Sequence, residues 1–283
     1  MSSHKIPSSE KITVPFLRAA KERGDRLTCL TAYDYPTARI VDEAGVELIL
    51  VGDSAANVIL GYDNTIPVTM DEMMFAVRAV RRGVEKALLV ADMPYGSYHL
   101  NELETVKNAL RFVKEGGAQA VKLEGGRNRI EIIRRLVNEE IPVMAHIGLT
   151  PQSFNKSGGY RLQGKTEESA QSLIDDAKAL EDAGVFSVVL ELVPRELAQK
   201  ITETVKISTI GIGAGANCDI QVLVLHDMLG LNFGRLPRFV RKYAELRETM
   251  TAAIQNWKSD VKTGNYPNDN ESYALPQGVE IKN

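Results

Sequence analysis

Residues 48–54 read Leu-Ile-Leu-Val-Gly-Asp-Ser, and residues 87–94 read Ala-Leu-Leu-Val-Ala-Asp-Met-Pro. In both segments a continuous apolar run ends in an aspartate. Continuous apolar runs of this length are typical of strands buried on both faces, as in a parallel sheet. The two segments therefore predict buried parallel strands that carry an acid at their carboxyl ends.

Runs of the same type recur along the chain and alternate with segments of helical periodicity. The expected strands span residues 27–32, 48–52, 87–91, 120–123, 142–147, 187–190, 208–212 and 222–225. The expected helices span residues 37–44, 70–82, 101–115, 129–138, 166–183 and 195–204. Eight strands that alternate with helices predict the α/β class and a closed (β/α)8 barrel, or TIM barrel. A doubly wound open sheet is the alternative.

Three regions are expected along the chain. Residues 1–20 would form an N-terminal extension or helix, and residues 21–258 a single barrel domain that includes a C-terminal helix. That helix carries Trp257, the only tryptophan. Residues 259–283 are rich in Asn, Pro, Gly and charge, which predicts a polar tail or an arm on a neighbouring subunit.

The composition excludes several classes of protein. The chain has 283 residues, and its 34 basic and 37 acidic residues give a net charge of −3, so it offers no basic field to nucleic acid or to an anionic membrane. No apolar segment approaches the ~20 residues of a membrane-spanning helix, and the polar N-terminus does not resemble a secretion signal. Only Cys29 and Cys218 are present, too few for a disulfide framework. We expect a cytoplasmic protein with reduced cysteines.

Acidic side chains stand at the carboxyl ends of four expected strands. They are Asp53, Asp92, Glu124 and Glu191. All carboxyl ends of a parallel barrel emerge on one face, where barrel enzymes place their chemistry, so we expect these acids to converge there with Lys122 and His146. One lysine cannot neutralise four acids. A hard divalent cation such as Mg²⁺, which prefers carboxylate oxygens and water, would do so.

Each residue also has a purely structural interpretation. Asp53 ahead of Ser54 would suit a helix or turn cap, and Asp92 before Met-Pro would suit a turn. Lys122 and Glu124 lie two apart on one strand, so they would share a face and form a plain salt bridge. His146 would serve equally as a hydrogen-bonded core residue, and Glu191 as a surface residue beyond its strand. The functional interpretation depends on all of them occurring on one face.

Five longer motifs follow one another along the chain. They are Val51-Gly-Asp-Ser54, Ala91-Asp-Met-Pro94, Val121-Lys-Leu-Glu-Gly-Gly126, His146-Ile-Gly-Leu-Thr-Pro-Gln152 and Ile210-Gly-Ile-Gly-Ala-Gly215. In order and spacing they resemble the ketopantoate (3-methyl-2-oxobutanoate) hydroxymethyltransferase family, over residues 21–266. The resemblance implies transfer of a hydroxymethyl group from 5,10-methylenetetrahydrofolate to 3-methyl-2-oxobutanoate, giving 2-dehydropantoate (ketopantoate) and tetrahydrofolate on the route to pantothenate and coenzyme A.

The resemblance also implies roles for the strand-end residues. Asp53 and Asp92 would ligate Mg²⁺, with Glu124 completing the metal site through water. The 2-oxo acid would contact Asp53, Ser54, Asp92 and Lys122. These roles are expectations carried over from the family's motifs.

Two further roles and one departure come with the resemblance. His146 would line the substrate pocket, and Glu191 would be the general base. Where the family usually continues with Leu-Gly after Val-Gly-Asp-Ser, this chain has Ala55-Ala56-Asn57, which puts the local backbone path in doubt. The family is also known for homo-oligomers, decamers among them.

Two other functions compete with this one. Magnesium-dependent carbon–carbon lyases and phosphonomutases of the isocitrate lyase-like barrel group also place acids around Mg²⁺ and an oxo acid, but they rely on a catalytic cysteine or a phosphonate pocket that is not evident here. A catalytically silent barrel that acts as a binding protein would require the loss of one or more ligands. All four acids are present, which favours the enzyme.

Overall fold

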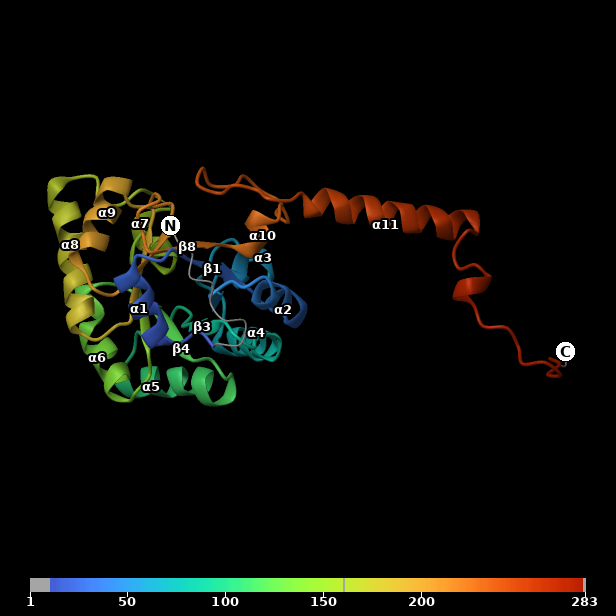
Figure 1. The fold of residues 1–283 in the computed structure, drawn as a ribbon, viewed down its shortest axis with the longest axis horizontal. Coiled ribbons are helices and arrows are strands. Elements are labelled where there is room, and N and C mark those ends of the chain that lie inside the picture. The colour runs from blue at the N-terminus through green and yellow to red at the C-terminus, as the bar shows by residue number, and fades with distance from the viewer. Residues whose placement is uncertain (1–10, 160, 282–283) are drawn as a thin grey trace. The chain divides into compact units, whose positions relative to one another are not determined.

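A closed parallel barrel forms the centre of the fold (Figure 1). The computed structural model describes residues 11–159 and 161–281. Within them, eight strands pair in sequence order, and β1 closes the barrel by pairing in parallel with β8. The strands are β1 (Leu27–Thr31), β2 (Leu48–Val51), β3 (Leu88–Asp92), β4 (Ala120–Glu124), β5 (Val143–Gly148), β6 (Ser187–Glu191), β7 (Ser208–Ile212) and β8 (Ile220–Leu223). The predicted (β/α)8 barrel is confirmed, and the open sheet is not formed.

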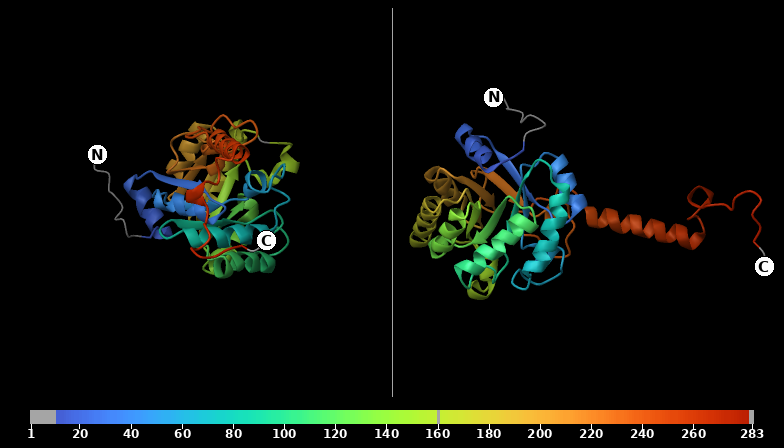
Figure 2. Two further views of the ribbon diagram at one scale, coloured as in Figure 1. Left: turned by 90° about the vertical axis from the view of Figure 1, so that its right-hand side faces the viewer. Right: turned by 90° about the horizontal axis from the view of Figure 1, so that it is seen from below.

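Helices follow most of the strands of the barrel and cover its outer face (Figure 2). The helices of the described residues are α1 (Val14–Arg23), α2 (Tyr35–Glu43), α3 (Ala55–Val58), α4 (Met70–Gly83), α5 (Glu102–Leu110), α6 (Ile130–Asn138), α7 (Phe154–Ser157), α8 (Glu167–Asp182), α9 (Arg195–Thr204), α10 (Leu225–Met228) and α11 (Leu246–Thr263). A π-helical turn, Arg111–Glu115, extends α5. Short 3-10 turns occur at Arg127–Arg129, Pro151–Ser153 and Asp269–Glu271. No helix in the described residues is long and apolar enough to span a membrane.

Two expected boundaries were wrong. The last strand was expected at residues 222–225 but lies at Ile220–Leu223, because Leu225 already begins α10. In β8, Gln221 is exposed between two buried residues, so the continuous apolar run of the sequence begins only at Val222. The C-terminal helix runs past its expected end at Lys258 to Thr263, where Gly264 in a left-handed conformation ends it.

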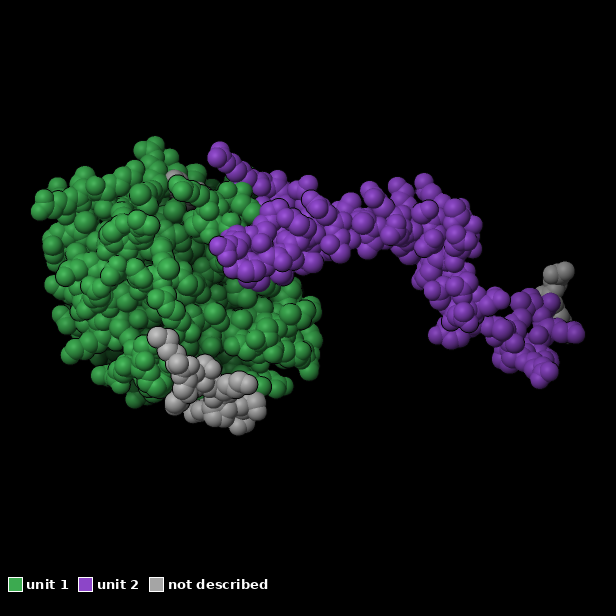
Figure 3. All heavy atoms as spheres, turned by 45° about the horizontal axis from the view of Figure 1, so that its top comes forward, with its two compact units in different colours: residues 1–225, 236–240 green, residues 226–235, 241–283 purple. Residues whose placement is uncertain are grey.

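The chain divides into two compact units (Figure 3). The first contains the barrel and runs to Leu225, together with Leu236–Val240. The second contains His226–Arg235 and the chain from Arg241 onward, and thus α11. The expected boundary between residues 258 and 259 therefore falls inside a helix of the second unit.

Alternate residues of the strands point into the barrel and fill it. Leu88 and Val90 of β3, Met144 of β5 and Val189 of β6 belong to one buried cluster. Leu17 of α1 joins the same cluster and is 1% exposed. The amino-terminal helix therefore packs against the barrel interior, and Lys21 fixes its last turn with an ion pair of 2.9 Å to Asp219.

We expect Leu17→Ala to lower the free energy of unfolding by about 2–5 kcal/mol, because a fully buried leucine would leave a cavity in the barrel interior. Urea titration followed by circular dichroism measures this loss. Arg18→Ala is the matched control on the same helix: Arg18 is exposed, so its change should stay within about 0.5 kcal/mol. Equal effects of the two substitutions would contradict the role of α1 as part of the core.

Candidate active site

The alternation that fills the barrel also sets the direction of the charged residues at its carboxyl end. In β3, Asp92 follows the inward residues Leu88 and Val90 at the spacing of two that keeps side chains on one face. The same spacing places Lys122 and Glu124 inward after Ala120 of β4. By the same spacing His146 follows Met144, and Glu191 follows Val189. The expected convergence on one end of the barrel is thus built into the strands.

Asp92 and Lys122 form a buried ion pair next to Asp53. The Lys122 ammonium donates to both carboxylate oxygens of Asp92, at 2.8 and 2.7 Å. The Asp53 backbone N–H donates to Asp92 Oδ2 at 3.1 Å, which ties the end of β2 to β3. The three residues are between 1% and 5% exposed. The sequence expectation of a plain salt bridge between Lys122 and Glu124 is replaced by the Lys122–Asp92 pair.

Burial and the surrounding charges perturb this pair. Burial raises the pKa of Asp92 above its ordinary value, the ammonium of Lys122 opposes the rise, and Asp53 adds to it. Burial lowers the pKa of Lys122, but the charges of three acids, Asp92, Asp53 and Glu124, raise it by more than burial lowers it. The net direction is upward, and the ammonium stays charged. Lys122 is thus surrounded by three buried acids, an arrangement that favours the binding of a further cation.

A second line of contacts runs from Glu124 through His146 to Glu191. His146 Nδ1 lies 3.5 Å from Glu124 Oε1, and His146 Nε2 lies 3.2 Å from Glu191 Oε2. Burial and the charge of Lys122 lower the pKa of His146, but its two carboxylate neighbours outweigh them and raise it to about 9. The imidazole is therefore positively charged at neutral pH and holds the two acids. The Glu191 side chain is 16% exposed, whereas those of Glu124 and His146 are 3% exposed.

Backbone geometry beside Glu191 is unusual. Gly148 of β5 pairs in register with Glu191, and a Cβ on Gly148 would lie 2.3 Å from the Glu191 carbonyl oxygen. Leu192, the next residue, has φ of 45°, a left-handed conformation that is rare outside glycine and concentrated at functional sites. The chain turns sharply where the general base is expected.

Two residues that sequence reasoning missed connect the two lines of contacts. The Gln152 side-chain amide donates to Asp53 Oδ2 and to the Met93 carbonyl, both at 3.0 Å, and its backbone N–H donates to Glu124 Oε2 at 3.1 Å. Tyr98 Oη donates to Gln152 Oε1 at 2.5 Å and accepts from the Glu124 backbone N–H at 3.2 Å. Gln152 closes the His-Ile-Gly-Leu-Thr-Pro-Gln motif, which was the available signal.

Ser54 and the altered segment after it lie at the start of a short helix. Ser54 Oγ is hydrogen-bonded to Tyr33 Oη at 2.8 Å. Ala55 and Ala56 are buried, and Asn57 donates from its side chain to the Tyr62 carbonyl. The departure from Leu-Gly is accommodated as the first turn of α3, directly after Asp53 and Ser54.

The acids do not form a ready-made three-ligand metal centre. Among the described residues, no group of three His, Cys, Asp or Glu side chains lies close enough to hold a metal ion. Gln152 stands between Asp53 and Glu124 and bonds to both. Asp53 and Asp92, by contrast, are adjacent, and Glu124 Oε1 is buried without a hydrogen bond among the described residues. This donor set fits Mg²⁺, which takes one or two carboxylates together with waters and substrate oxygens.

Solved structures of related fold share the architecture. A phosphonopyruvate hydrolase is 14% identical with a TM-score of 0.59, over 94% of this chain and 92% of that chain. A 2,3-dimethylmalate lyase of the PEP mutase/isocitrate lyase superfamily is 17% identical with a TM-score of 0.58, over 93% of this chain and 92% of that chain. At this level of identity the likeness concerns the fold alone, so the lyase and phosphonomutase alternatives gain no support beyond it.

Sequence comparison is decisive. The family model described as ketopantoate hydroxymethyltransferase matches residues 11–269. A 3-methyl-2-oxobutanoate hydroxymethyltransferase of Koribacter versatilis is 57% identical over 95% of this chain and 92% of its own length. Proteins of the same name from Carboxydothermus hydrogenoformans and Geobacter metallireducens are 53% and 52% identical, over 94% of this chain and 96% and 100% of theirs. With this identity over nearly the whole length, the chain belongs to the ketopantoate hydroxymethyltransferase family.

Proposed function

We propose that the chain transfers the one-carbon unit of 5,10-methylenetetrahydrofolate, as a hydroxymethyl group, to 3-methyl-2-oxobutanoate. The products would be 2-dehydropantoate and tetrahydrofolate, with one water consumed. The reaction follows from the name that the relatives share. The observation that carries the residue roles is the buried cluster of acids around Lys122, with Glu191 more exposed at its edge.

The oxo acid would bind at the buried end of this cluster. Asp53 and Asp92 would hold Mg²⁺, and Glu124 would contact it through water. When bound, Mg²⁺ would offset the acid charge and polarise the keto group of the substrate. Lys122 already lies against Asp92 and would pair with the substrate carboxylate, while Ser54 would donate a hydrogen bond to the substrate.

Glu191 would remove the proton from C3 of the bound oxo acid. His146, positively charged, orients the Glu191 carboxylate through its contact of 3.2 Å. The electron pair left at C3 would then attack the one-carbon unit, and water would supply the hydroxyl oxygen as tetrahydrofolate leaves. The partial exposure of Glu191 gives the base access to substrate, while the ion-binding acids remain buried.

The second unit supports association with further copies of the chain. Along α11, the exposed residues Met250, Ile254, Trp257 and Val261 follow the spacing of one helical stripe. None of the residues of this helix is buried. An uncovered apolar stripe marks a protein contact, so we propose a homo-oligomer. Because Cys29 and Cys218 are buried and unpaired, we also propose a reducing, cytoplasmic setting.

Turnover tests the proposed reaction directly. The purified chain should form 2-dehydropantoate from 3-methyl-2-oxobutanoate only with methylenetetrahydrofolate present, and EDTA should abolish the rate until Mg²⁺ is restored. Product formation is followed by liquid chromatography with mass detection. Full activity in excess EDTA would overturn the assignment of the acid cluster to a metal, and absence of product with all components would overturn the reaction.

Replacement of the base separates its role from binding. In Glu191→Gln we expect exchange of the C3 proton of 3-methyl-2-oxobutanoate in D₂O to slow by roughly 10²–10⁴-fold, because the amide cannot accept the proton. Binding of the oxo acid should stay close to that of the wild type. Proton NMR measures the exchange. Glu196→Gln, an exposed change on α9, is the control and should exchange normally; unchanged exchange in the Glu191 variant would assign the base elsewhere.

Gln152 should act as a positioning residue for the metal site. Gln152→Met removes the amide that bonds to Asp53, and we expect the Mg²⁺ concentration for half-maximal C3 exchange to rise about 10–100-fold, the usual effect of losing a partner of a metal ligand. Gln119→Met is the control: Gln119 Oε1 accepts from the Leu89 N–H at the opposite end of the strands. If both variants lose thermal stability but neither shifts the Mg²⁺ requirement, Gln152 is merely structural.

A further inference from the structure

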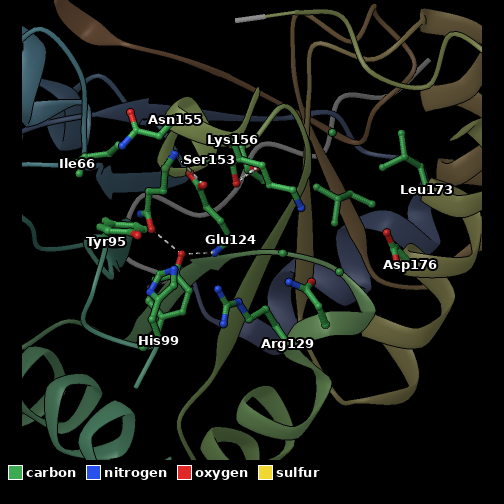
Figure 4. A pocket seen from close by; sticks show the side chains of 18 residues that line it. Ile66, Tyr95, His99, Glu124, Arg129, Ser153, Asn155, Lys156, Leu173 and Asp176 are labelled. Atoms are coloured by element: carbon green, nitrogen blue, oxygen red, sulfur yellow. Dashed lines mark hydrogen bonds between the residues drawn. The ribbon is translucent and has the colours of Figure 1, made fainter. Parts of the chain in front are cut away.

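A cavity of about 540 Å³ opens beside the acid cluster (Figure 4). Glu124 and Gln152 contribute to its wall and are 4% exposed, whereas Tyr95 and Lys156 lie in its exposed part. The cavity therefore extends from the buried acids to solvent. Asp53, Asp92 and Lys122 do not line it, so it adjoins the expected oxo acid site without coinciding with it.

One wall of the cavity is aromatic. The Tyr95 and His99 rings lie 4.7 Å apart, and the Tyr98 and His99 rings lie 4.3 Å apart. Burial and the charge of Arg129 lower the pKa of His99 to about 4, so its ring is neutral at pH 7. Figure 4 shows Tyr95 and His99 on one side of the cavity and Leu173 and Asp176 on the other. Such a wall suits a flat ring.

The cavity also carries cationic groups. Arg129 Nε is buried and has no hydrogen-bond partner among the described residues, and its guanidinium lies 5.2 Å from the centre of the Tyr98 ring. Lys156 on α7 is exposed. The acid on the far wall, Asp176, is already paired with Arg127 at 2.8 Å. Two positive charges therefore remain for an anionic ligand.

We propose that this cavity binds the folate donor, an inference that rests on the proposed function. The reacting one-carbon end must reach the oxo acid, so it lies at the buried end beside Glu124. The aminobenzoyl ring then lies along the wall of Tyr95 and His99, and the glutamate carboxylates extend toward Arg129 and Lys156. A volume of about 540 Å³ is within the range of small-molecule sites, ~300–1,000 Å³.

The test reverses one charge on the enzyme and removes one from the ligand. Calorimetric binding of tetrahydrofolate to the full chain should weaken about threefold to tenfold in Lys156→Glu, because the reversal replaces an exposed charge attraction by a repulsion of similar size. Lys178→Glu, an exposed change on α8 outside the cavity lining, is the matched control and should bind as the wild type does. Tetrahydropteroate, which lacks the glutamate, should bind Lys156→Glu and wild type equally.

The outcomes separate this inference from the proposed function. Exchange of the C3 proton of the oxo acid needs no folate, so it should be unchanged in Lys156→Glu. If tetrahydrofolate binds Lys156→Glu and Lys178→Glu equally well, the cavity is not the folate site. If the Lys156 variant weakens tetrahydropteroate as much as tetrahydrofolate, the orientation with the glutamate at Lys156 is wrong. If the wild type itself shows no exchange of the C3 proton, the proposed chemistry is overturned instead.

Discussion

The register of the parallel strands decides which charges meet. Asp92 is paired in register with Lys122, Glu124 with His146, and Gly148 with Glu191. Because side chains alternate along a strand, a shift of one residue in any of these ladders would turn an acid from the barrel interior to the helix layer. Closure of the barrel removes that freedom, since each strand is held on both sides. The direction of these strand residues is therefore a consequence of strand pairing, whereas Asp53 and Gln152 lie in turns that follow β2 and β5.

Buried charge is costly, and this site limits the cost by pairing each acid with a fixed donor. Asp92 accepts from Lys122 and from the backbone of Asp53, and Asp53 accepts from Gln152. The amide of Gln152 is oriented in turn by Tyr98. Gln152 donates its side-chain amide to Asp53 and its backbone N–H to Glu124, so a neutral residue separates the two carboxylates and keeps both within one network. Such a network holds the acids in place before any ligand binds.

The fold and the charged strand ends could be predicted because both depend on local patterns. Continuous apolar runs mark strands, and an acid directly after such a run must emerge at the carboxyl face. Gln152 and Tyr98 could not be predicted in the same way, since they follow β5 and β3 in loops and their roles depend on contacts between distant segments. The position of β8 was missed for a related reason: exposed Gln221 interrupts its pattern, and only pairing with β1 and β7 fixes it.

The two parts of the site differ in how far their side chains are buried. The residues proposed to hold the ion and the oxo acid carboxylate are nearly dry, so their electrostatic interactions are strong. Glu191 lies at the edge of the buried acids. It contacts His146, and the backbone turns at the next residue, Leu192. The proposed base would have to meet substrates that enter from solvent, and the left-handed turn at Leu192 fixes the position of Glu191 without burying it. The proposed binding and proton transfer would thus be divided between the ends of β2, β3 and β4 and the end of β6, which one barrel can supply together.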